Sequence, residues 1–370
     1  MDRSLIRPGV AEPERYKTVK RPLFMKHGFG IIGAGAIAEV HARAIDTIMD
    51  AELVGVYDSQ PEQALSFSSK FNCGVYPTAG ELCNDSRIDI VSVCTPSGLH
   101  LEPALEVIKA GKHCIIEKPL EVTLERCDRI IEAAALRNVK VSGIFPMRFS
   151  RVFIELKNAI DEGRFGKLVM GDAYVKWYRD DAYYEDVRWR ADRGLSGGGA
   201  VMNQAIHSID LLRWFMGKVD SVSAFTGLIG HRNLEVEDSA AAALRFSNGA
   251  VGVIEASTAI SPGFYRKIEI LGTEGSVIVE EDKILVWKFN KEKPDDQRIR
   301  AKYSGKHTSG GGVSDPRAIS DIGHLCQLLD IIRSIENGHP SAVDAPEARK
   351  AVELVLAIYE SARQKKIIYL

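Results

Sequence analysis

The chain has 370 residues, more than one hydrophobic core usually organises, so we expect two domains. Its 48 lysines and arginines nearly balance its 50 aspartates and glutamates, and the net charge is -2. Without an overall positive field, nucleic acid and anionic membrane surfaces are not expected partners. Hydrophobic residues make up 45% and charged residues 26%, the balance of an ordinary globular protein.

Residues 1–26 are basic and proline-rich and lack the apolar centre of a secretory signal, so we expect an N-terminal arm. No run approaches the ~18 apolar residues that a membrane span requires. The six cysteines are scattered without a C-x-x-C pair. This usage favours a reduced, cytoplasmic protein without a metal site.

Short β-rich runs alternate with helical stretches over residues 27–147. Runs such as IVSVC and CIIE are apolar on both faces, which is typical of parallel strands covered by helices on both sides. A further helix is predicted to begin after Thr123, a good N-cap residue, and to end at Asn138. The alternation predicts a doubly wound α/β domain with a parallel sheet.

The pattern changes beyond Arg148. A helix predicted over residues 152–162 precedes strand-like runs of alternating polarity, and Asn248-Gly249 indicates a turn between two of them. Residues 148–370 are therefore predicted to form a second α/β domain with a large, mostly antiparallel open sheet.

The C-terminal part of this second domain is expected to contain a loop and two helices. The polar, glycine-rich stretch 290–312 is interpreted as a long surface loop. Asp315 and Pro316 are predicted to cap a helix that ends at Asn337-Gly338, and residues 345–364 to form the last helix.

A glycine-rich turn follows the first strand and opens a helix, the context of a dinucleotide-binding turn. Its first glycine permits the tight turn, its second lets the backbone approach a pyrophosphate, and the small Ala38 allows close helix–strand packing. Phosphates are expected at the helix N-terminus, where free N–H groups favour anions. We assign Gly33, Gly35, Ala36 and Ile37 to cofactor binding; a turn without a ligand is the alternative.

Asp58 ends the second strand, 23 residues after Gly35. A carboxylate there can accept hydrogen bonds from ribose hydroxyls and repel a 2′-phosphate, and Ser59-Gln60 offers no arginine for that phosphate. NAD is therefore predicted over NADP. A simple capping role for Asp58 is the alternative.

Four further motifs follow in order: T-P-x-x-x-H at 95–100, E-K-P at 117–119, the segment 197–210 and the pattern at 357–362. Together they resemble the family of glucose–fructose oxidoreductase, inositol dehydrogenase and rhizopine-catabolism proteins, from about Lys26 to Leu370. The resemblance implies an N-terminal Rossmann domain and a C-terminal α/β domain with an open sheet. It also implies NAD(P)-dependent oxidation or reduction of a sugar, nucleotide-sugar or cyclitol carbinol. Cofactor binding is accordingly extended to Thr95, Pro96, His100, Glu117 and Lys118. Arg148 follows the last strand of the Rossmann domain and is also assigned to cofactor binding, with a substrate role as the alternative.

Lys118 lies at the carboxyl end of a parallel strand, where open α/β sheets place their ligands. An alcohol gives up hydride readily only as its O–H proton departs, so a base or an oriented proton relay must contact the hydroxyl. Lysine can serve where burial and nearby cations lower its pKa. Lys118 is therefore a candidate catalytic residue, with a surface salt bridge as the alternative.

His207 follows a glycine triplet at the expected start of a helix, with Asn203 at i-4 and Asp210 at i+3 on one face. Histidine exchanges protons near neutrality, so His207 is the second catalytic candidate. Many members of the resembled family have an aspartate where this chain has Asn203. An amide cannot take the proton, so Asn203 is assigned to substrate binding.

Trp189, Arg190 and Tyr184 are assigned to substrate binding, because aromatic faces and a guanidinium suit a pyranose; a core role is the alternative. His324 and Gln327 are expected to be solvated or to pack between domains rather than to contact substrate.

Three functions remain open from sequence: a sugar or cyclitol dehydrogenase, an NAD-using glycoside hydrolase of the same fold, and a non-catalytic NAD-binding regulator. Net NADH formation would support the first, and glycone release without it the second. Intact Lys118 and His207 argue against the third. The open sheet leads us to expect a homodimer or tetramer.

Overall fold

The computed structural model describes residues 26–305 and 321–370. They form two compact units. The first runs to Pro146 and includes Asp321–Arg349, and the second takes up the chain from Met147 and ends with Lys350–Leu370. The predicted N-terminal arm lies outside the described residues except for Lys26.

The first unit contains a parallel sheet with the strand order β3-β2-β1-β4-β5-β6. Ile32 pairs with Tyr57 on one side and with Val93 on the other, and Val93 pairs with Ile116, so these strands end side by side. The order reverses between β1 and β4, which confirms the predicted doubly wound fold. The strands are β1 (His27–Ile32), β2 (Ala51–Tyr57), β3 (Gly74–Val75), β4 (Ile90–Val93), β5 (His113–Ile116) and β6 (Val141–Gly143).

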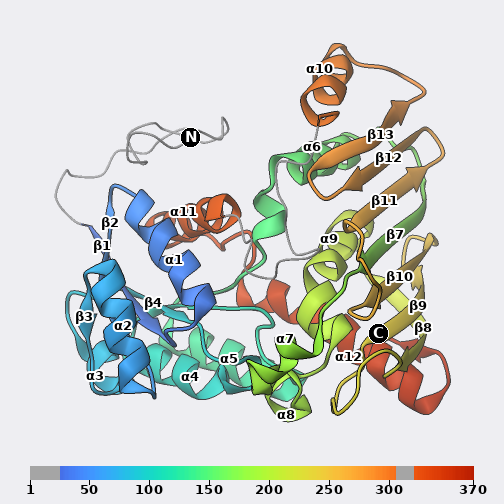
Figure 1. Ribbon diagram of the computed structural model, residues 1–370. Helices are drawn as coiled ribbons and strands as arrows, with labels where there is room; N and C mark the ends of the chain where they lie inside the picture. Colours follow the sequence, from blue (N-terminus) through green and yellow to red (C-terminus); the bar gives the residue numbers. More distant parts are fainter. Residues whose placement is uncertain (1–25, 306–320) are drawn as a thin grey trace. The chain divides into compact units, whose positions relative to one another are not determined.

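Helices cover this sheet, with α1 beside α11 and α4 beside α5 (Figure 1). Helix α5 shows how local sequence sets the ends: Thr123 accepts the N–H of Arg126, and Asn138 stops the helix in the left-handed conformation, as predicted. The helices are α1 (Ala36–Thr47), α2 (Pro61–Phe71), α3 (Ala79–Asn84), α4 (Leu101–Lys109), α5 (Leu124–Arg137) and α11 (Asp321–Asn337).

Helix α11 packs in the first unit, whereas the sequence placed all of residues 148–370 in the second domain. Its Leu325, Leu328 and Ile332 join the core that contains Phe29. An apolar stripe shows that a helix buries one face, but not against which partner. The predicted end at Asn337-Gly338 is confirmed, with Gly338 at φ +73°, while the predicted cap at Asp315-Pro316 lies outside the described residues.

The second unit contains an eight-stranded sheet in the order β13-β12-β11-β7-β10-β9-β8-β14. Among the described strands of this sheet only β7 and β10 pair in parallel, so the prediction of a mostly antiparallel sheet is confirmed. Gly249, at φ +90°, turns the chain between β9 and β10 as expected. The strands are β7 (Leu168–Lys176), β8 (Val219–Gly227), β9 (Ser239–Phe246), β10 (Val251–Ser257), β11 (Lys267–Gly272), β12 (Gly275–Glu280), β13 (Lys283–Phe289) and β14 (Ile368–Tyr369).

One face of this sheet is buried and the other is open. Along β9, Ala242, Leu244 and Phe246 are buried, while the residues between them are exposed. The helices of the unit are α6 (Arg151–Asp161), α7 (Asp181–Glu185), α8 (Arg193–Ser196), a π-helical segment (Ala200–Ala205), α9 (Ile206–Met216), α10 (Pro294–Tyr303) and α12 (Ala345–Gln364), which begins in the first unit.

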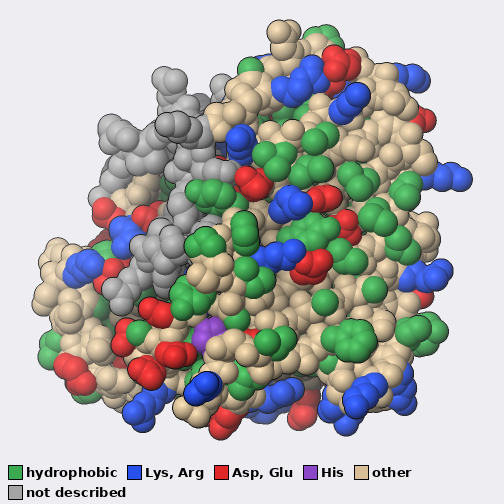
Figure 2. Space-filling model, turned by 45° about the vertical axis from the view of Figure 1, so that its right-hand side comes forward, with side chains coloured by type: hydrophobic (Ala, Val, Ile, Leu, Met, Phe, Trp, Pro, Cys, Tyr) green, Lys and Arg blue, Asp and Glu red, His purple; other side chains and the backbone are tan. Residues whose placement is uncertain are grey.

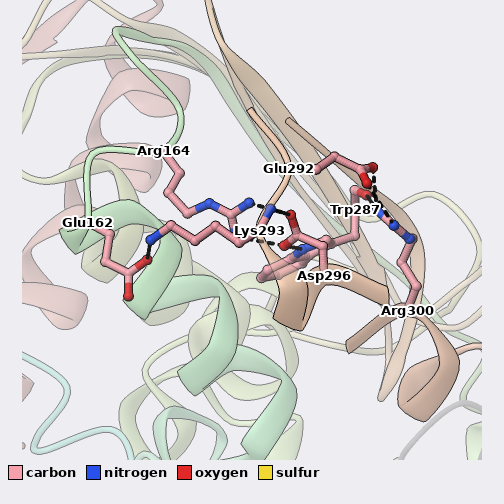
Figure 3. Close-up of polar contacts among 7 residues, drawn as sticks. All are labelled: Glu162, Arg164, Trp287, Glu292, Lys293, Asp296 and Arg300. Atoms are coloured by element: carbon pink, nitrogen blue, oxygen red, sulfur yellow. Dashed lines mark hydrogen bonds and ion pairs between the residues drawn. The ribbon is translucent and has the colours of Figure 1, made fainter. Parts of the chain in front are cut away.

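The prediction of a surface loop over 290–312 is wrong for residues 294–303, which form α10; residues 306–312 lie outside the described part. The sequence is polar, but buried Asp296 fastens the helix start. Its carboxylate accepts two N–H groups of Arg164, at 2.8 and 2.6 Å, and the indole N–H of Trp287 at 2.7 Å (Figure 3). One buried carboxylate thus replaces the apolar stripe that a helix usually needs.

No helix in the described ranges is long and apolar enough to cross a membrane. The six cysteines are free thiols, and five of them are buried. Burial raises the pKa of the Cys83 thiol to about 12, as expected for a cysteine that packs as a small hydrophobe.

Candidate active site

The glycine-rich turn has the geometry of a pyrophosphate cradle. Gly33 has φ +96°, and a Cβ there would lie 2.8 Å from the backbone of Cys94, so no side chain fits. Gly35 is the N-cap of α1, makes no side-chain cap, and has no atom within 4 Å of the position a Cβ would take. The start of α1 is therefore open to an anion.

Asp58 is bonded to this turn. One carboxylate oxygen accepts the N–H of Ala34 at 2.7 Å, and the other accepts the N–H of Gln60 at 2.9 Å. Each oxygen keeps a second lone pair, so the carboxylate can still accept a ribose hydroxyl. The side chain thus ties the end of β2 to the turn, a role that sequence alone did not separate from ribose binding.

His100 joins the two loops that carry the T-P-x-x-x-H and E-K-P motifs. Its ring is buried, and its nitrogens lie 2.9 Å from the carbonyl oxygens of Thr95 and Pro119. Burial lowers the pKa of His100. The structure therefore shows His100 bracing two loops at the carboxyl ends of β4 and β5, with both nitrogens turned to the backbone.

Glu117 lies in a buried histidine–glutamate–histidine group. His41 Nε2 is 2.9 Å and His324 Nε2 is 3.7 Å from the same carboxylate oxygen, and His41 Nδ1 is 3.1 Å from Ser92 Oγ. Burial alone would raise the pKa of Glu117, but its interactions with the imidazoles of His324 and His41 hold it well below its usual range. Sequence analysis assigned Glu117 to cofactor binding and did not single out His41. It expected His324 and Gln327 to be solvated or to pack between domains, and this is wrong: both are buried within the first unit, where Gln327 accepts the N–H of Phe145 and donates to the carbonyl oxygen of Gly143.

The other oxygen of Glu117 accepts the backbone N–H of Lys118 at 3.1 Å. The buried group therefore fixes the backbone of the catalytic candidate, whose own side chain is half-buried at the end of β5. The ligand atoms of His41, Glu117 and His324 lie within 4.8 Å of one another, a set that could hold a metal ion. The 2.9 Å contact is an ordinary hydrogen-bond length, and we interpret the group as a hydrogen-bond network.

In the second unit, His207 follows a π-helical segment rather than an ordinary helix start. Asn203 lies within that segment and accepts a hydrogen bond from the side chain of Gln204 at 3.3 Å. Asp210 is buried and accepts two N–H groups of Arg148, at 2.7 and 2.5 Å. The expected polar face of three residues is thus divided, because Asp210 turns inward to Arg148.

The predicted substrate segment is likewise divided. Tyr184 is buried, with its hydroxyl 2.9 Å from Thr258 Oγ1, and burial raises its pKa to about 12. Arg190 stacks 4.1 Å from the ring centre of Tyr183, whose hydroxyl accepts a hydrogen bond from Gln204 at 2.7 Å. Arg190 is thus linked to Asn203 through Tyr183 and Gln204. Tyr184 instead has a core position, and Trp189 is half-buried.

Residues 27–145 match the oxidoreductase family with an NAD-binding Rossmann fold, and residues 153–278 match the GFO/IDH/MocA C-terminal domain. The crystal structure of the WlbA dehydrogenase from Bordetella pertussis, in complex with NADH and UDP-GlcNAcA, is 32% identical; the match covers 93% of this chain and 99% of that one, with a TM-score of 0.82. The chain belongs to the GFO/IDH/MocA family. It is an oxidoreductase with an NAD-binding Rossmann domain.

Curated relatives of this GFO/IDH/MocA protein include the myo-inositol 2-dehydrogenase of Thermotoga maritima, 27% identical over 92% of this chain and 98% of the relative. The NADP(+)-dependent scyllo-inositol 2-dehydrogenase of Bacillus subtilis is 26% identical, over 92% of this chain and 95% of the relative. The name of this relative states NADP(+), whereas the WlbA structure is a complex with NADH, so the cofactor differs among the similar proteins.

Proposed function

We propose that the protein is an NAD-dependent dehydrogenase that acts on a CH–OH group of a sugar, nucleotide sugar or cyclitol. The observation that carries this proposal is the anchored Lys118, held by Glu117 at the carboxyl edge of a sheet whose glycine turn is open to a pyrophosphate. Gly33, Gly35 and Asp58 would hold NAD, which when bound accepts hydride from the carbinol carbon.

Lys118 and His207 are proposed to exchange the hydroxyl proton. Both side chains are partly buried, and both residue types can move a proton near neutral pH once their surroundings tune the pKa. Asn203 can only donate and accept hydrogen bonds, so it is proposed to orient the substrate.

Substitution of the two proton-exchange groups tests this proposal. Lys118→Ala and His207→Ala should each lower kcat by roughly 100-fold or more, while the affinity for NAD changes little. Lys109→Ala, at an exposed lysine of α4, is the matched control and should keep wild-type kcat. Near-wild-type turnover in His207→Ala would remove His207 from the mechanism.

The substrate class is best tested by following NADH formation over inositols, hexoses, uronates and nucleotide sugars. Nucleotide-sugar uronates come first in this screen, because the 32% identical relative was crystallised with UDP-GlcNAcA. Inositols come next, since curated relatives are named inositol dehydrogenases. Release of a glycone without net NADH would instead support a glycoside hydrolase.

Preference for NAD over NADP is proposed from Asp58. A 2′-phosphate near this carboxylate would meet repulsion, and neighbouring Ser59 and Gln60 supply no positive charge. We expect NAD to bind at least roughly tenfold more tightly, which corresponds to about 1.4 kcal/mol. Titration with both cofactors tests this assignment, and tighter binding of NADP would refute it.

Self-association through the open sheet face is also proposed. This face mixes apolar and charged side chains (Figure 2): Phe225 is 80% exposed on β8, and Lys176 pairs with Glu255 beside Tyr174. Light scattering should find a dimer or tetramer that Phe225→Asp weakens. Leu136→Asp, at a leucine of α5 that is 87% exposed, is the control. A stable wild-type monomer at micromolar concentration would contradict this expectation.

A further inference from the structure

The helix that carries Asn203 and His207 begins with four consecutive backbone N–H groups that all have acceptors. Glu237 accepts three of these N–H groups. Its carboxylate accepts those of Gly199 at 3.0 Å and Val201 at 2.9 Å, and its carbonyl oxygen accepts that of Ala200 at 3.0 Å. The fourth N–H, that of Met202, donates to the hydroxyl of Tyr359 at 3.1 Å. Helix starts usually leave these groups to water or ligands.

Glycines make this close approach possible. A Cβ on Gly198 would lie 2.0 Å from the Tyr359 hydroxyl, and one on Gly199 would lie 1.8 Å from the carbonyl oxygen of Glu237. The glycine triplet therefore lets Glu237 and Tyr359 reach the helix start. Because its first four N–H groups are engaged, this start is not a phosphate site, unlike the open start of α1.

Glu237 and Tyr359 also bind each other. The Tyr359 hydroxyl donates to the carboxylate at 2.9 Å while it accepts from Met202, so one connected group spans α12, the segment before β9 and the helix start. Asn203 follows directly, with its N–H on the carbonyl oxygen of Gly199 at 2.9 Å. A shift of this start would therefore move Asn203 and His207 together.

We propose that Glu237 and Tyr359 are positioning residues that set the placement of Asn203 and His207. This inference rests on the proposed role of His207 in proton transfer. The proposed role is geometric. A negative carboxylate at a helix N-terminus is favoured by the helix dipole whether or not a substrate is bound.

Glu237→Gln is the sharpest probe, because it keeps the size of the side chain but replaces one acceptor oxygen with an NH₂ group. In either orientation of the amide, a donor then faces the N–H of Gly199 or of Val201. Tyr359→Phe is the milder probe: it removes the acceptor of the Met202 N–H and the hydroxyl that donates to Glu237, but it leaves both carboxylate oxygens of Glu237 in place. Glu235→Gln, at an exposed glutamate two residues away, is the matched control.

We expect Glu237→Gln to lower kcat by roughly 10-fold to 100-fold and Tyr359→Phe by less, with NAD affinity unchanged, because small misplacement of a reacting group is costly. Titration of His207, followed by ¹H–¹⁵N spectra of labelled histidine, should shift in Glu237→Gln and stay unchanged in Glu235→Gln. Should Glu237→Gln fail to fold, Tyr359→Phe supplies the same measurements.

Loss of thermal stability with unchanged kcat and an unchanged His207 titration would overturn the positioning role. That result is distinct from failure of the proposed function, which would be wild-type turnover in His207→Ala.

Discussion

Two carboxylates in the second unit each hold the start of a helix, but they do so with different partners. Asp296 accepts hydrogen bonds from the Arg164 guanidinium, the Trp287 indole and the backbone of Lys293. Glu237 accepts from two backbone N–H groups and the Tyr359 hydroxyl, all of them neutral. A positive partner is the difference between the two sites.

The pKa values move in opposite directions as a result. Burial alone would raise the pKa of Asp296, but the hydrogen bonds, led by those from Arg164, lower it to about 2. Burial raises the pKa of Glu237, and its neutral donors do not reverse that shift. The fold therefore favours the ionised form of Asp296 and disfavours the ionised form of Glu237.

This contrast separates a stability role from a geometric one. The ion pair at Asp296 fastens a polar helix that has little apolar surface of its own. Glu237 accepts the N–H groups of Gly199 and Val201, which precede Asn203 in the chain, although burial disfavours its ionised form. We infer that it maintains the shape of the helix start.

The largest effect is expected for Asp296→Ala. Removing the carboxylate leaves Arg164, only 8% exposed, as an unpaired buried charge and releases the start of α10. Breaking a buried pair in this way costs about 3–5 kcal/mol of unfolding free energy. Urea unfolding measures the loss, and kcat of the folded enzyme should stay near wild type. A loss as small as that of an exposed ion pair would show that Asp296 is not structural.

Local signals predicted much of the fold but not its long-range partners. Thr123 and Asn138 marked both ends of α5, and the alternation of strands and helices marked the parallel sheet. Helix α10 was missed because its sequence is polar, and the buried carboxylate that anchors it is recognised only from its contacts in the structure. Placement of α11 was missed because its partner is chosen by packing across the chain.

The candidate site shows the same limit. The glycine turn, Lys118 and His207 were selected as candidates because each belongs to a compact motif. His41 and Glu117 are 76 residues apart, and Glu237 lies 38 residues from Gly199. No periodic pattern links such pairs in a single sequence, so residues that position the site through distant contacts emerged only from the structure.

A smaller effect is expected from pH, and its sign distinguishes the two carboxylates. The pKa of Asp296 is lowered on folding, so its contribution is present above its ordinary value of 3.8 and is lost as pH falls toward about 2. The pKa of Glu237 is raised, so its contribution is present below 4.5 and is lost as pH rises through the folded value.

Unfolding free energies measured against pH test this contrast. Relative to wild type, Asp296→Asn should lose less stability on acidification, because the titrating group is gone. Glu237→Gln should gain stability relative to wild type as pH rises from about 4 to 7, because the variant lacks the buried carboxyl group whose ionisation destabilises the folded wild-type protein. The same slope in both variants would abolish the distinction drawn between the two carboxylates.

The smallest effect is expected for Glu292→Ala, in the same group as Asp296 (Figure 3). Glu292 accepts from Arg300 at 3.0 Å, but the two side chains are 61% and 37% exposed, so water screens the pair and replaces its hydrogen bonds. We expect a loss of about 0–1 kcal/mol, read from the same urea curves as Asp296→Ala. Both changes remove a carboxylate that pairs with an arginine near α10, so the ratio of their effects compares a buried pair that also caps the helix with an exposed pair. Comparable losses would mean that α10 depends on its charge count rather than on the buried pair.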